Sequence, residues 1–293
     1  LIFSTISFLY PFAELEAIGR KDIYVILLFS IFVLISFRNL NESILFFLAI
    51  FTISSLIHEI SFFYLPYFFI VIFCVSKLKF KKNLNFIHFF LISIVLCFLI
   101  YLNLIIGNKV DINEMVMSYK MINIDISSGS GALGWLGKPF SHHFSIIKDK
   151  ISFLSILRYG YILLINLFIF LYFIRFKNNL NFLSVEVTSK KIFFGLAILS
   201  LPIYLVALDW GRVTYINFNF MLLLTIYFKK NNLIDDDFLE ERLNKIKLKF
   251  KFLIFLFICI LFSPKILIDD DFSGLPLYKT LSKLNKLLEL NLF

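Results

Sequence analysis

Apolar runs follow one another along most of this chain, and short polar stretches separate them. They fall at residues 1–13, 23–37, 44–57, 60–76, 86–106, 157–174, 192–208, 213–228 and 252–268. A helix that crosses the hydrocarbon core of a bilayer needs about 20 mostly apolar residues. Hydrophobic residues make up 60% of the chain, whereas a soluble domain contains about 45–50%. The pattern predicts an all-α fold, a polytopic integral membrane helical bundle of about eight to nine spans with one large external loop.

Two apolar stretches are too long for one span, and each contains charged residues near its middle. The stretch 43–76 is interrupted by His58-Glu59. Because ionised side chains are costly inside a membrane helix, the sequence predicts two helices joined by a tight turn at that point. The same argument divides 192–228 at Asp209–Arg212.

Lysine and arginine are concentrated in alternate loops, which indicates how the bundle is oriented. They are dense around residues 77–82, 175–191 and 229–251. Cytoplasmic loops of membrane proteins carry an excess of Lys and Arg, so these loops are predicted to be cytoplasmic. The net charge of +9 is therefore interpreted as loop charge. The sequence contains no basic run interleaved with exposed aromatic residues, so nothing in it indicates a nucleic-acid partner.

The same topology places every unusual polar cluster on the opposite, external face. These clusters are residues 19–22, His58-Glu59, the long segment 107–156 and Asp209–Arg212. One face of the bundle is therefore expected to carry the chemistry.

The domain organisation follows from this topology. The chain is predicted to form a single transmembrane domain over residues 1–293, with 107–156 as a large external loop, 229–251 as a cytoplasmic loop and 269–293 as an external C-terminal tail. Because Leu1 already lies inside an apolar run, one or more N-terminal helices are expected to be missing.

Common catalytic motifs are absent from the sequence. It contains no Walker A, GxGxxG, GxSxG or CxxC pattern, so ATP-driven transport, soluble cofactor chemistry and serine hydrolysis lack a basis. His58-Glu59 does not begin an HExxH zinc motif, because position 62 is Phe. We expect neither a metal nor a cofactor.

Asp209 and Arg212 form an acid and a base three residues apart between two apolar runs. Gly211 favours a turn there, and Trp210 is typical of a membrane-interface anchor. The pair is interpreted either as an ion pair that caps two helices or as an acid and a phosphate-binding guanidinium at the mouth of a cavity. Arginine suits the second role because its planar fork binds phosphate through two hydrogen bonds.

Glu59 is flanked by Ile57-His58 and Ile60 at a predicted helix end, where burial would raise its pKa and suit it to act as a general base. His58 would assist it. The alternative is a hydrogen-bonded pair that joins two helices.

Arg20 and Lys21 precede a helix predicted to open at Ile23. Such cations either anchor to lipid headgroups or, on the external face where positive residues are disfavoured, bind a specific anion such as a lipid-linked diphosphate. Lys138, in the glycine-rich segment 127–139, is a further candidate that the external loop would bring to the site.

The order of these clusters resembles one known family. An Arg-Lys-Asp cluster before a helix, His-Glu after an apolar run, and Asp-x-Gly-Arg between two later helices resemble the EpsG/Wzy-type membrane proteins of polysaccharide assembly. The resemblance spans about residues 19–228 and depends on motif order and shared face, since each motif is short. It implies an all-helical glycosyltransferase or polymerase of the bacterial cytoplasmic (inner) membrane that acts externally on undecaprenyl-diphosphate-linked sugars.

That reaction requires a carboxylate to take the acceptor hydroxyl's proton, cations to stabilise the departing diphosphate, and a lateral opening for the polyprenyl tail. The expected partners are a polyprenyl-diphosphate-linked oligosaccharide, membrane lipid and other glycan-assembly proteins. The proposed base is Glu59 or Asp209 with His58 assisting, and the proposed diphosphate-binding cations are Arg20, Lys21, Arg212 and Lys138.

Two other functions fit the same sequence. A transporter or flippase for an amphipathic or anionic solute would use these charges as a binding site that opens to both faces in turn, whereas the enzyme needs access from one face. A non-catalytic membrane scaffold is the third alternative, and it leaves the charges at the helix boundaries unexplained.

Overall fold

The computed structural model describes residues 21–81, 84–108, 112–121, 140–177, 180–182, 185–207, 209–246 and 250. This part of the chain is mostly helical, as predicted, with ten α-helices and one short strand pair that was not predicted. In chain order the elements are α2 (Asp22–Leu34), α3 (Leu40–Ile57), the 3-10 helix η2 (Glu59–Tyr64), α4 (Leu65–Cys74), the π-helical turn η3 (Val75–Lys79), α5 (Phe86–Asn108), α6 (Ile112–Met121), α7 (Phe140–Lys150), α8 (Phe153–Phe173), β1 (Leu180–Phe182), β2 (Val185–Val187), α9 (Ser189–Ser200), the 3-10 helix η5 (Leu201–Leu205), α10 (Trp210–Lys230) and α11 (Asp236–Lys245).

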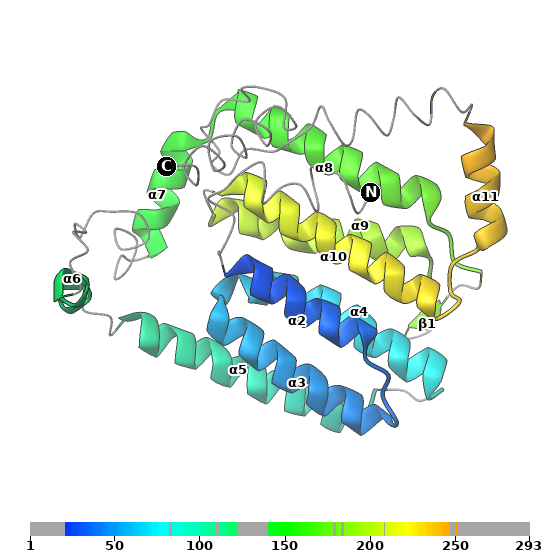
Figure 1. Cartoon of the computed structure of the whole chain (residues 1–293), viewed down its shortest axis with the longest axis horizontal. Helices are drawn as coiled ribbons and strands as arrows, with labels where there is room; N and C mark the ends of the chain where they lie inside the picture. The colour runs from blue at the N-terminus through cyan, green and yellow to red at the C-terminus, as the bar shows by residue number, and fades with distance from the viewer. Residues whose placement is uncertain are drawn as a thin grey trace, which may run out of the picture.

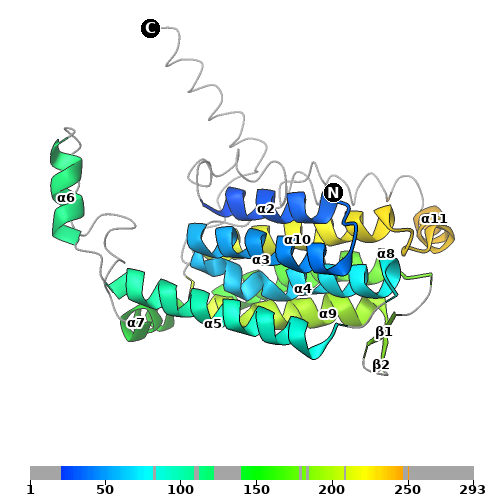
Figure 2. The same ribbon diagram turned by 90° about the horizontal axis from the view of Figure 1, so that it is seen from below.

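The long helices lie side by side, with their axes roughly parallel or antiparallel to one another (Figure 1). α10 is central, because it packs against α2, α4, α8 and α9. Seen from the side, α2 and α5 lie at opposite edges, and α3 and α4 lie between them (Figure 2). α6 and α7 lie beyond the bundle end at which α2 and α10 begin.

α10 buries polar and apolar side chains alike, which explains its central place. Asn217 is 3% exposed and Phe220 is fully buried. Buried amides need hydrogen-bond partners, and Asn217 Nδ2 donates to Ser200 Oγ at 2.8 Å. Tyr67 Oη also donates to Asn217 Oδ1. The bundle centre is therefore partly polar, and its hydrogen bonds join α10 to α4 and α9.

Phenylalanine packing fixes α2 and α4 against α10. The ring of Phe29 stacks on Phe220 with centroids 4.2 Å apart and meets Phe68 edge-on at 4.8 Å. Such aromatic pairs contribute about 0.5–1.5 kcal/mol each beyond the area they bury. This contact packs the middle of α2 against the middle of α10.

Three helices in the described ranges are long and apolar enough to cross a membrane, which is consistent with a membrane protein. They are Leu40–Ile57, Glu59–Lys77 and Ser155–Phe173, and the shorter apolar helices are Asp22–Leu34 and Phe86–Leu102. The predicted count of about eight to nine spans is not supported. Several predicted runs fold as helices that are too short, and the runs 1–13 and 252–268 lie outside the described residues.

The predicted break at His58-Glu59 is present: α3 ends at Ile57, and η2 begins at Glu59. The second predicted break is displaced. α9 ends at Ser200, and η5 follows with Pro202 in its first turn.

α10 then begins at Trp210, with Asp209 in the N-cap position. Gly211 and Arg212 are therefore helical, and the turn expected at Asp209–Arg212 lies before them. Proline favours the first positions of a helical turn, which explains why the chain breaks early.

The segment 107–156, predicted to be a large loop, contains the short helices α6 and α7. Its glycine-rich part, 127–139, lies outside the described residues, as do 1–20 and the predicted tail 269–293.

Candidate functional site

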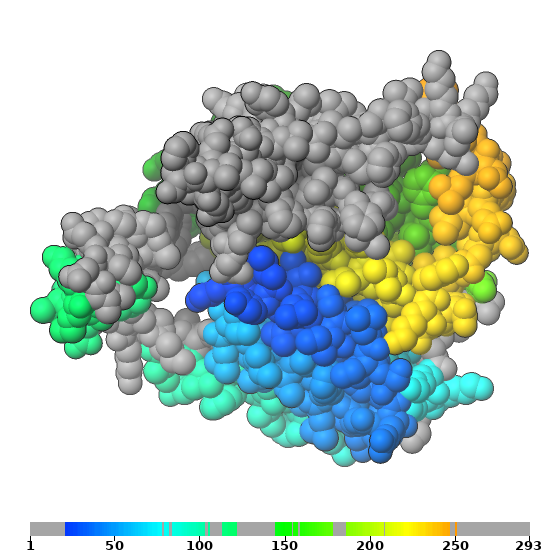
Figure 3. Space-filling view, in the orientation of Figure 1, coloured from blue at the N-terminus to red at the C-terminus, as the bar shows by residue number. Residues whose placement is uncertain are grey.

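Five charged or titratable side chains from three separate segments meet at one end of the bundle, and we term them the charged cluster. Asp22 is the first residue of α2, His58 and Glu59 lie at the junction of α3 and η2, and Asp209 and Arg212 lie at the start of α10. Figure 1 shows these three helix ends on the same side of the molecule, and Figure 3 shows α2 next to α3 and α10 on its surface.

The contacts within the cluster form a continuous chain with Asp22 at its centre. His58 Nε2 lies 3.2 Å from Asp22 Oδ1, and Arg212 Nε lies 3.2 Å from Asp22 Oδ2. His58 Nδ1 lies 3.1 Å from Glu59 Oε2, and Arg212 Nη1 lies 2.9 Å from Asp209 Oδ2. Acid and base therefore alternate from Glu59 at one end to Asp209 at the other.

Burial divides the cluster into an enclosed part and an open end. The Asp22 side chain is 4% exposed, those of His58, Arg212 and Asp209 are 12–18% exposed, and that of Glu59 is 72% exposed. Removing charges from water is costly unless they are paired. The positive ends of the helix dipoles of α2 and α10 also favour the carboxylates of Asp22 and Asp209. Glu59 is thus the group that an outside molecule can reach. The raised pKa predicted for Glu59 is wrong, because the side chain is exposed and its hydrogen bond with His58 lowers the pKa instead.

His58 is held between two carboxylates, and this determines its protonation. Burial lowers the pKa of His58, but its interactions with Asp22 and Glu59 outweigh burial and raise the pKa above its ordinary value. Both ring nitrogens face a carboxylate oxygen, and only the protonated ring donates from both. The imidazolium form is therefore favoured.

The buried pairing is incomplete in its hydrogen bonds. Asp22 Oδ1 and Arg212 Nε are buried and have no hydrogen bond of good geometry within the described residues, although each lies 3.2 Å from an oppositely charged group. Unsatisfied buried polar atoms are rare in folded proteins. The cluster is therefore paired in charge but imperfectly aligned.

Hydrogen bonds behind the cluster fix the segments that carry it. Tyr64 Oη donates to the carbonyl of Val213 at 3.1 Å, which ties η2 to α10. Trp210 Nε1 donates to the carbonyl of Tyr204 at 2.8 Å, and the hydroxyls of Tyr204 and Thr214 lie 3.0 Å apart. These bonds hold η5 and the first turn of α10 together.

The predicted site residues fall into three groups. His58, Glu59, Asp209 and Arg212 come together as their predicted shared face requires. Lys21 is exposed at the start of α2 and lies within electrostatic reach of Glu59. The other two predicted cations, Arg20 and Lys138, lie outside the described residues.

The sequence indicated no role for Asp22, which lies in the Arg-Lys-Asp motif. The structure places Asp22 at the centre of the charged cluster. A carboxylate at the first residue of an apolar helix was the available signal. Its partners could not be found from spacing, because His58 and Arg212 come from distant parts of the chain. Across the described ranges, no group of three or more His, Cys, Asp or Glu side chains is arranged to hold a metal ion.

Comparison with known proteins identifies no relative: no family model, curated protein or solved structure matches this chain.

Proposed function

We propose that this chain is a multi-pass enzyme of the bacterial inner membrane that transfers or polymerises polyprenyl-diphosphate-linked sugars during cell-surface polysaccharide assembly. The observation that carries the proposal is the open end of the charged cluster. An exposed carboxylate, Glu59, contacts His58, which a buried carboxylate, Asp22, holds from the other side. The family resemblance in motif order supplies the substrate class.

The cluster suggests separate roles for its members. Glu59 takes the proton from the acceptor hydroxyl, whose oxygen then bonds to the anomeric carbon of the lipid-linked sugar as the bond from that carbon to the diphosphate oxygen breaks. The diphosphate leaves with the electron pair, and Lys21 is placed to stabilise its charge. His58 orients Glu59, and Arg212 holds Asp22 and Asp209 in position.

Replacement of Glu59 by glutamine tests this proposal. Glu59→Gln keeps the size of an exposed side chain, so we expect normal insertion. We expect about 10²–10⁴-fold slower elongation of a polyprenyl-diphosphate-linked oligosaccharide, the usual contribution of a general base. The assay follows product length in membrane vesicles that contain the full chain.

Glu42→Gln is the matched control, because Glu42 is an exposed carboxylate at the start of α3, at the other end of the bundle. It accepts a hydrogen bond from the Arg38 amide at 2.7 Å, which a glutamine oxygen can also accept. If the Glu59→Gln variant elongates the oligosaccharide at the wild-type rate, Glu59 is not the general base.

A transporter or flippase for an amphipathic or anionic solute is the second candidate. One observation favours it: polar side chains continue from the cluster into the bundle along α10, from Thr214 to Asn217, and both are buried. A transport pathway requires such polar groups inside the membrane.

Thiol labelling separates the two candidates. The variant Thr214→Cys, in a chain lacking Cys74, Cys97 and Cys259, is treated with a membrane-impermeant maleimide from each side in turn. The enzyme predicts no labelling from the side of the lysine-rich loops. Labelling from both sides supports the transporter.

A further inference from the structure

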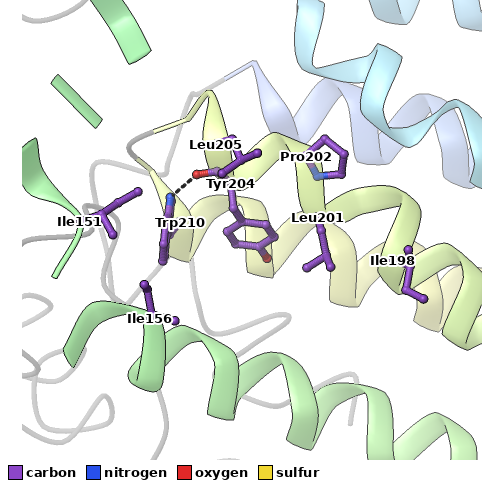
Figure 4. A pocket seen from close by; sticks show the side chains of 8 residues that line it. All are labelled: Ile151, Ile156, Ile198, Leu201, Pro202, Tyr204, Leu205 and Trp210. Carbon is purple, nitrogen blue, oxygen red and sulfur yellow. Dashed lines mark hydrogen bonds between the residues drawn. The ribbon is translucent and has the colours of Figure 1, made fainter. Parts of the chain in front are cut away.

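Two neighbouring cavities lie along α9 and share the residues Ile198 and Leu201. The outer cavity, of about 420 Å³, lies between the start of α8, η5 and Trp210 (Figure 4). The inner cavity, of about 270 Å³, lies between α8, α9 and α10 and reaches Met221. Because they share two lining residues, the cavities are neighbours along α9, and we term the pair the α8–α9 groove.

The groove is too apolar to hold water well. A bound water needs two to four polar partners. In the inner cavity, both amide atoms of Asn217 are already engaged by Tyr67 and Ser200. Asn166 Oδ1 is the buried side-chain acceptor there that lacks a hydrogen bond within the described residues. A cavity of about 150 Å³ lined by apolar side chains stays dry and binds benzene, and both cavities are larger than that.

The groove opens on a surface that suits hydrocarbon rather than water. Leu164 on α8 and Phe194 on α9 both line it and are 66% and 53% exposed. α8 contains one of the three candidate membrane spans. In a bilayer the mouth of the groove therefore faces lipid chains, which reach it without crossing water.

The outer end of the groove lies at the same end of the bundle as the charged cluster. Trp210 lines this end. It directly follows Asp209 and is the first residue of α10, the helix that carries Arg212. Tryptophan is typical of the boundary between hydrocarbon and headgroups. An amphipathic molecule in the groove would place its polar end at this boundary.

We propose that the α8–α9 groove binds a hydrocarbon chain of a membrane lipid, with the lipid's polar head at the end of the bundle that carries the charged cluster. The inference concerns binding alone, so it holds for the enzyme and for the transporter and does not rest on the proposed reaction.

Photo-labelling tests the proposal. The full chain is reconstituted in phosphatidylcholine vesicles that contain a phosphatidylcholine with a diazirine in its acyl chain, and labelled residues are mapped by mass spectrometry. Met221 is 3% exposed and belongs to the central helix, yet it lines the groove. We expect Met221 to be labelled, because a chain in the groove contacts it.

Gly160 offers a variant that fills the groove without a clash. It lines the inner cavity, and a Cβ atom added there meets no atom within 4 Å. Gly160→Leu should reduce labelling of Met221 about fivefold or more by occupying the space next to α8. Gly195→Leu is the matched control: Gly195 also has open space for a Cβ atom, but it lies outside both cavity linings.

Labelling of lipid-facing Leu164 checks that each variant is inserted, and Gly160→Ala should give an intermediate effect. The proposal is wrong if wild-type Met221 is unlabelled while Leu164 is labelled, the result expected if another segment of this chain or a second copy fills the groove. It is also wrong if inserted Gly160→Leu labels Met221 as strongly as the wild type does.

Discussion

The two ends of the bundle use the same kinds of charged residue in opposite ways. At one end, Asp22 pairs with Arg212, and these side chains are 4% and 15% exposed. At the other end, Lys229 pairs with Asp236, and these side chains are 56% and 41% exposed. The first end joins three distant segments, whereas this second pair joins neighbours along the chain.

The burial of the charged side chains, rather than their charge alone, therefore distinguishes the candidate site from the other end of the bundle. Exposed ion pairs are screened by water and salt, and typically contribute about 0–1 kcal/mol. Buried charges depend on their partners, because a lone buried charge is strongly unfavourable. Another lysine at the second end satisfies a carbonyl group where a helix ends: Lys230 Nζ donates to the Leu34 carbonyl at 2.5 Å.

The largest effect is expected from Arg212→Ala. This change leaves Asp22 buried without its guanidinium partner, and breaking a buried pair costs about 3–5 kcal/mol. Denaturant unfolding in detergent micelles measures the loss. Arg175→Ala is the control at the second end, since Arg175 is 63% exposed beside Asp235. Equal destabilisation by the two variants would contradict the comparison.

Asp22→Asn should have a smaller effect of about 1–3 kcal/mol, because asparagine keeps the shape and still forms hydrogen bonds. Arg212 would retain Asp209 at 2.9 Å. The pKa of His58 should fall, because one of the two carboxylates that raise it is lost. NMR titration of the imidazole signals measures this fall, and an unchanged His58 pKa would show that Asp22 is not its partner.

Stability should depend on pH through His58. Its pKa is raised in the folded protein, so its stabilising contribution is complete below its unfolded pKa of about 6.5. That contribution is lost as the pH rises through the higher folded pKa. Unfolding midpoints measured across this range should decrease for the wild type, and the decrease should be weaker in His58→Gln. A parallel decrease in both proteins would exclude His58 as its source.

The smallest effect is expected from Lys229→Ala. Its partner Asp236 lies in water, where the lysine still lowers the pKa of that carboxyl. We expect an unfolding midpoint indistinguishable from that of the wild type at physiological ionic strength. A midpoint shift as large as that of Arg212→Ala would show that the two ends are equivalent.

The sequence by itself determined the helical class and the position of one of the two predicted breaks. Long apolar runs have few alternatives to helices in a membrane, and His58-Glu59 marks a chain break that the structure contains. It also predicted that Asp209–Arg212 and His58-Glu59 share one end of the bundle, since Lys and Arg density orients alternate loops. The predicted eight to nine spans are not supported within the described residues, because a run of apolar residues does not reveal where a helix shortens.

Tertiary structure alone decided how the charges are connected. Asp22 and Arg212 are separated by most of the chain, and their 3.2 Å contact depends on the packing of Phe29 against Phe220 between α2 and α10. Sequence spacing predicts contacts only within one helix. The groove likewise exists only because α8, α9 and α10 leave space beside Gly160. Side-chain packing between distant segments arises only in the folded chain, and a local sequence pattern does not predict it.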